Sequence, residues 1–180
     1  MIQVQRILGL PVLLESGKRI GKVKDLWFDE FWGLVGIVLD KNAWSGFRKL
    51  PKIVYWKDIV HCGEDALLIR NSAVIATKDN KQLLRTFHTG VVRLKDMPIY
   101  TIEGLRLGEV SDVYFKLPEG KQLKDTQLEG TQIIGYELTD GFLADVFEGR
   151  RKLFLPEATD NIILGDDAIL VPASYERILT

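Results

Sequence analysis

The stretch GLPVLLESGKRIGKVKDLWFD at residues 9–29 decides the fold, because DMPIYTIEGLRLGEVSDVYFK at residues 96–116 repeats it. The two stretches share their proline, turn glycines and acidic residue at one constant offset: Pro11 with Pro98, Gly17 with Gly104, Gly21 with Gly108, and Asp25 with Asp112. Self-similarity at a fixed spacing indicates two copies of one supersecondary unit.

The rest of each copy follows in the same order. The short apolar run at residues 34–39 is typical of a buried strand, and its residues 35–39 match residues 134–138 of the second copy. The segment GEDALLI at 63–69 recurs as GDDAILV at 165–171. The second copy is longer because of residues 117–131, whose polar composition predicts a surface loop. Short strands separated by glycine turns predict an all-β fold of two small barrels in tandem.

The expected domains are a first barrel over residues 1–72, a linker over 73–89 and a second barrel over 90–180. A short helix is expected in the linker at residues 78–87, where Leu83, Leu84 and Phe87 have helical spacing. Asp79 or Asn80 would cap its start.

These motifs resemble the PRC-barrel, the β-barrel of the photosynthetic reaction centre H subunit and of the C-terminal domain of ribosome maturation factor RimM. The resemblance rests on Gly17, Gly21 and Asp25 with residues 63–65, and on their counterparts in the second copy. It implies two PRC-type barrels that act as a non-enzymatic interaction module, as in the stand-alone tandem PRC-barrel proteins of bacteria. The chain has neither the membrane-spanning helix of the H subunit nor the N-terminal domain of RimM, so neither specific function carries over.

The repeated residues are predicted to be structural. Gly17 and Gly104 suit hairpin turns that need positive φ, and Gly21 with its counterpart Gly108 suits a strand bulge. Asp25 and Asp112 are interpreted as hydrogen-bonding the neighbouring backbone rather than a ligand.

The sequence predicts no enzymatic activity, no metal site and no cofactor. His61 and Cys62 are adjacent and His88 is remote, so no zinc-binding spacing occurs. Cys62 lacks an oriented base nearby in sequence, and no phosphate-binding loop is present.

The near-zero net charge hides an asymmetry between the copies. Residues 1–87 carry 14 Lys and Arg against 9 Asp and Glu, whereas residues 88–180 carry 10 against 16. This difference is either electrostatic complementarity or drift on solvated faces. A single cysteine, no signal-peptide pattern and no apolar run long enough to span a bilayer favour the cytoplasm.

A protein partner is expected, and the first choice for its site is an aromatic and basic loop containing Trp44, Phe47, Arg48 and Lys49. In the alternative, Trp44 and Phe47 fold back over the open end of the barrel. RNA or ribosome association is a second hypothesis, based on Lys18, Arg19, Lys22, Lys24 and the likeness to RimM, although the acidic second copy disfavours it. Homo-oligomerisation is left open.

Overall fold

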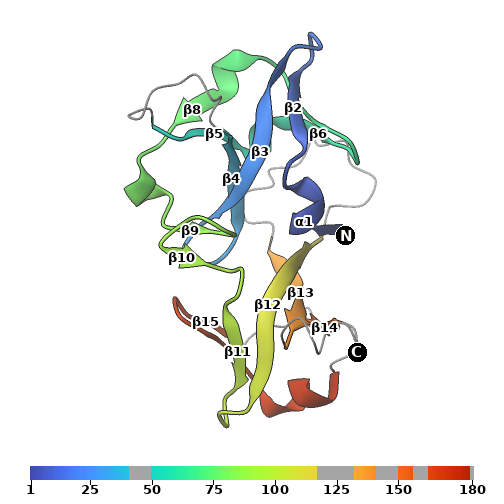
Figure 1. The fold of residues 1–180 in the computed structure, drawn as a ribbon, viewed down its shortest axis with the longest axis vertical. Helices are drawn as coiled ribbons and strands as arrows, with labels where there is room; N and C mark the ends of the chain where they lie inside the picture. Colours follow the sequence, from blue (N-terminus) through green and yellow to red (C-terminus); the bar gives the residue numbers. More distant parts are fainter. Residues whose placement is uncertain (41–49, 117–131, 141–149, 156–161, 179–180) are drawn as a thin grey trace.

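The computed structural model describes residues 1–40, 50–116, 132–140, 150–155 and 162–178. It is an all-β fold of two curled half-barrel sheets, stacked along the long axis of the molecule (Figure 1). The β2–β3 hairpin lies at one end of the molecule and the β11–β12 hairpin at the other.

The first sheet has the strand order β6-β7-β2-β3-β4-β5-β8, with β9 added on β3 and β10 on β9. Its strands are β2 (Pro11–Leu14), β3 (Arg19–Phe28), β4 (Leu34–Leu39), β5 (Lys52–Tyr55), β6 (Ile59–Cys62), β7 (Leu67–Ile69), β8 (Ile75–Thr77), β9 (Arg85–Thr86) and β10 (Val92–Arg93).

The second sheet has the order β14-β13-β12-β11-β16-β15, with β1 added on β12. Its strands are β1 (Ile2–Gln3), β11 (Pro98–Thr101), β12 (Arg106–Phe115), β13 (Ile133–Thr139), β14 (Arg151–Phe154), β15 (Ile163–Leu164) and β16 (Ile169–Val171). Among the described residues, the helical elements are α1 (Val4–Ile7) and the 3-10 turns Trp56–Asp58, Ser72–Val74, Asn80–Gln82 and Ala173–Ile178.

The duplication seen in the sequence is present in the pairing of the strands. Val12 opposes Gly21 in the first hairpin, and Ile99 opposes Gly108 in the second, each beside a register shift. Parallel pairing closes both copies in the same way, β2 on β7 and β11 on β16. The turn glycines Gly17 and Gly104 have φ of 83° and 90°, a region that residues with a Cβ rarely adopt. Equivalent residues therefore have equivalent structural positions.

The short helix expected in the linker is a single 3-10 turn at Asn80–Gln82, shorter than the pattern over residues 78–87 predicts. Asp79 caps it by accepting from the backbone N–H of Lys81, and Gln82 reciprocates by accepting from the N–H of Asp79. Helical spacing does not continue because Arg85 and Thr86 pair with β3 as strand β9. Tertiary strand pairing overrides the local pattern here.

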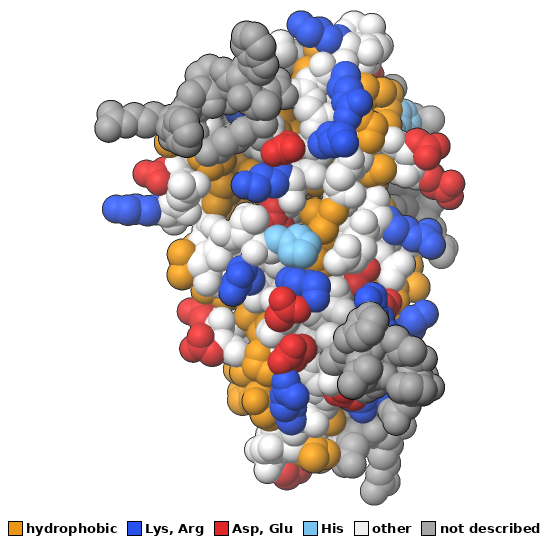
Figure 2. Space-filling view, viewed as in Figure 1, with side chains coloured by type: hydrophobic (Ala, Val, Ile, Leu, Met, Phe, Trp, Pro, Cys, Tyr) orange, Lys and Arg blue, Asp and Glu red, His pale blue; other side chains and the backbone are white. Residues whose placement is uncertain are grey.

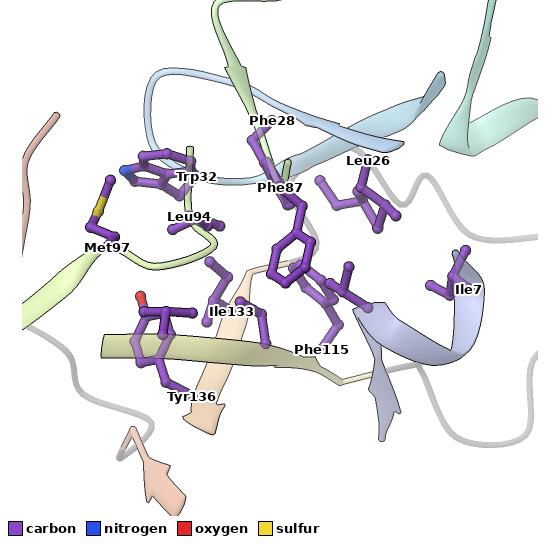
Figure 3. Close-up of a cluster of buried hydrophobic side chains, with 14 of the residues drawn as sticks. Ile7, Leu26, Phe28, Trp32, Phe87, Leu94, Met97, Phe115, Ile133 and Tyr136 are labelled. Carbon is purple, nitrogen blue, oxygen red and sulfur yellow. The ribbon is translucent and has the colours of Figure 1, made fainter. Parts of the chain in front are cut away.

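One hydrophobic core runs through both sheets (Figure 3). Phe28 of β3 and Phe115 of β12 stack on each other with ring centroids 6.0 Å apart, and both rings are buried. Trp32 and Trp56 are also buried, so two of the four tryptophans belong to the core. The two barrels are thus fused into a single packed body.

Candidate interaction surface

The loop residues predicted to contact a partner, Trp44, Phe47, Arg48 and Lys49, lie outside the described residues, as does the 117–131 insertion. The described chain on either side of this loop stops at Asp40 and resumes at Leu50.

A groove of about 280 Å³ lies on the first barrel next to these loop ends. One wall comes from the strands and the residue that precedes β5, namely Lys24, Val38, Leu39 and Pro51. The other wall comes from the linker, namely Asn80, Leu83, Thr86, Thr89, Gly90 and Val91. Val91 is 82% exposed and Lys24 is also exposed, so the groove offers an apolar side chain and an ammonium group to solvent.

The linker wall is held in place by the buried carboxylate of Asp25. Its Oδ1 accepts from the backbone N–H groups of Leu26 at 2.8 Å and His88 at 3.0 Å. Its Oδ2 accepts from the backbone N–H and the hydroxyl of Thr89, both at 2.7 Å. The hydroxyl oxygen of Thr86 adds acceptor bonds to the N–H groups of Thr89 and Gly90. Charge-assisted bonds of this kind are stronger than neutral ones, so the wall is rigidly positioned.

Asp112 occupies the equivalent place in the second barrel. Its Oδ1 accepts from the backbone N–H of Val113 at 2.8 Å and of Gln5 at 3.1 Å. Burial raises the pKa of this carboxyl. Each aspartate bonds the next backbone N–H, as the sequence predicts, but the bonds to Gln5, His88 and Thr89 were not foreseen. No local pattern signals them, because the partners lie far away along the chain.

An aromatic pair lies beside the groove on the outer face of the first sheet. Trp27 and Tyr55 are half-buried, with ring centroids 5.8 Å apart. The ammonium of Lys78 lies 5.8 Å from the Trp27 ring and 5.9 Å from the Tyr55 ring, and that of Lys57 lies 5.6 Å from Tyr55. These are cation–π distances.

The Trp27–Tyr55 pair and the groove are built on the same buried residues. Val38 and Leu83 line the groove and also form, with Ile53, the small buried cluster against which Trp27 and Tyr55 pack. We call this continuous surface, from Tyr55 and Trp27 across Val38 and Leu83 to Val91, the aromatic–groove face.

A basic group lies at the end of the first barrel. Lys18, Arg19, Lys22 and Lys24 are all exposed on or beside the β2–β3 hairpin, and basic side chains gather at that end of the molecule (Figure 2).

The described residues offer little support for catalysis. Burial raises the pKa of the Cys62 thiol to about 11, which keeps it protonated and weakly nucleophilic. Among these residues, no group of three or more His, Cys, Asp or Glu side chains is arranged to hold a metal ion. His88 packs edge-on against Phe87, with ring centroids 4.7 Å apart. In the same part of the chain, no helix is long and apolar enough to cross a membrane.

Two sheets of matching register around one core define a protein of the tandem small-β-barrel class. Residues 1–75 match the PRC-barrel domain family, and the two sheets fit a tandem PRC-type arrangement. The chain therefore contains a PRC-barrel domain over residues 1–75. PRC barrels are a non-catalytic family of interaction domains. No curated protein matches the chain.

Proposed function

We propose that this protein is a non-enzymatic scaffold that binds another protein through the aromatic–groove face of its first barrel. The observation that carries the proposal is the arrangement of Trp27, Tyr55 and Lys78 beside a groove with an exposed valine. Aromatic and cationic side chains around a partly apolar depression are typical of binding hot spots. The equivalent pair of the second barrel, Tyr114 and Phe154, has its ring centroids 5.4 Å apart, but Tyr114 is buried and donates its hydroxyl hydrogen to Glu137.

The loop with Trp44, Phe47, Arg48 and Lys49 belongs to the same proposal. It joins the barrel at Asp40 and Leu50, directly beside the groove residues Leu39 and Pro51. Its basic residues and Lys24 favour a partner with acidic and apolar side chains. We propose the cytoplasm as its location, in keeping with the single cysteine.

The test is affinity purification from the native host with wild type and three variants. Arg48→Glu with Lys49→Glu changes the loop, and Tyr55→Ala changes the aromatic pair. Arg93→Glu with Lys152→Glu is the matched charge reversal, because both side chains are exposed and outside the aromatic–groove face. We expect the same partner to be lost from the first two variants and retained by the third. A partner list that none of the variants alters would refute the site.

RNA binding is the second candidate, favoured by the exposed Lys18, Arg19, Lys22 and Lys24. Neutralisation of all four to Gln should abolish salt-sensitive retention on immobilised RNA, because phosphate contacts release counterions. Equal retention of the wild type and this variant would exclude the hairpin as an RNA site. If the wild type does not bind RNA at low salt, the candidate is rejected.

A further inference from the structure

The segment that leads into each barrel is docked on the other barrel. Strand β1 precedes the first barrel but pairs with β12 of the second, placing Gln3 opposite Tyr114. Strand β9 precedes the second barrel but pairs with β3 of the first, placing Thr86 opposite Trp27. Trp27 and Tyr114 are repeat equivalents, so the two dockings have the same register.

The repeated aspartates make the same exchange. Asp112 of the second barrel accepts from the N–H of Gln5, two residues after the strand pair at Gln3. Asp25 of the first barrel accepts from the N–H of His88, two residues after the strand pair at Thr86. Both bonds use Oδ1, at 3.1 and 3.0 Å. Each carboxylate therefore binds the backbone N–H at the same position of the docked segment, two residues after the strand pair.

The core has the corresponding symmetry. Phe28 and Phe115 are repeat equivalents and stack on each other with an interplanar angle of 19° (Figure 3). In a twofold interface, a residue near the axis meets its own equivalent, and every other contact occurs twice. Phe28 and Phe115 meet as such equivalents, and the strand pair and the aspartate bond each occur twice.

We infer that β3 and β12 each carry a docking site for an extended backbone segment, and that the two repeats bind each other through these sites as a twofold dimer closed within one chain. The partner that each site fits is the leading segment of the other repeat. Recognition comes from strand pairing and one buried carboxylate acceptor, which bind backbone rather than a particular side chain.

The two sites differ in strength. Asp25 engages His88 and Thr89 with both of its oxygens, whereas Asp112 engages Gln5 with Oδ1. The first barrel's site should therefore need both carboxylate oxygens, and the second only one acceptor.

Hydrogen exchange in the full chain, followed by mass spectrometry, tests the exchange of segments. Asp112→Ala should speed exchange at residues 2–8, which lie in the first repeat, and Asp25→Ala should speed it at residues 85–90. The expected increase is about tenfold or more, the size of losing one charge-assisted bond at a locally opening segment. Asp65→Ala, at an exposed turn, is the control and should change neither segment.

The conservative variants sharpen the test. Asp112→Asn keeps one acceptor oxygen, so residues 2–8 should remain protected from hydrogen exchange. Asp25→Asn loses one of the two oxygens that bind the segment, so residues 85–90 should still exchange faster than in the wild type. Faster exchange confined to the strands around the substituted residue, with the other repeat's segment unchanged, would overturn the inference.

A cut in the native chain gives a second test that does not depend on these variants folding. A protease site inserted between Lys81 and Gln82, which are both exposed, leaves β2–β8 on one piece and the docking strand β9 on the other once cleaved. We expect the two pieces to elute together at the size of the intact protein. Insertion of the same site at the exposed Glu64–Asp65 turn, within one barrel, controls for cleavage itself. Separation of the pieces in native buffer after the 81–82 cut would disprove mutual docking.

Discussion

Replacing Phe115 in the second barrel should destabilise the first barrel as well. Phe115 is 0% exposed and stacks on Phe28 at the centre of the shared core. Truncation of a buried phenylalanine to alanine typically costs about 3–5 kcal/mol of the free energy of unfolding. A domain's total is about 5–15 kcal/mol, so Phe115→Ala should shift the transition strongly without abolishing the fold in every case. Phe115→Leu, with a smaller loss, covers the case in which the alanine variant does not fold.

Tryptophan fluorescence makes this prediction specific, because all four tryptophans are in the first copy. Guanidinium unfolding of Phe115→Ala should move the fluorescence midpoint and the far-ultraviolet circular dichroism midpoint together. Ile102→Ala, which removes a side chain that is 62% exposed from the same repeat, should change the free energy of unfolding by no more than about 0.5 kcal/mol. An unchanged fluorescence midpoint in Phe115→Ala would show that the first barrel unfolds independently and would refute the single shared core.

Three further outcomes are expected. Gly36→Ala should cost about 1–3 kcal/mol, because a Cβ there would overlap the backbone carbonyl of Val54, whereas Gly21→Ala has room and should cost much less in the same urea titration. Cys62 in the folded protein should react with a thiol reagent about a hundredfold more slowly than in the denatured chain below pH 9, since its pKa is raised from 9.0 to about 11; equal rates would contradict this. The pKa of Asp112 is raised above 3.8 in the folded protein, so the folded state binds the carboxyl proton of Asp112 more tightly than the unfolded chain does. The stability that this proton contributes to the fold is fully present below pH 3.8 and is lost as the pH rises through the pKa of the folded state. In urea unfolding, the wild type should therefore lose more stability between about pH 3 and about pH 7 than Asp112→Asn does. If the stability difference between the two proteins is the same at both pH values, this prediction is wrong.

The candidate site shows how far local patterns carry. The aromatic and basic character of the first copy was evident from the sequence. The groove was not predicted, because its walls come from β4 and from a linker about forty residues later in the chain. Trp27 and Tyr55 meet Lys78 only because β3, β4, β5 and β8 lie side by side.

The sequence by itself determined the duplication, the all-β class, the hairpin turns at Gly17 and Gly104, and the local backbone bonds of Asp25 and Asp112. These follow from short-range physical constraints, since positive φ, strand alternation and an adjacent N–H act within a few residues. Only the tertiary structure decided that the leading segments cross between barrels and that Phe28 meets Phe115. Strand pairing and burial depend on partners far apart in the chain, and no local signal specifies which of two similar barrels a segment will join.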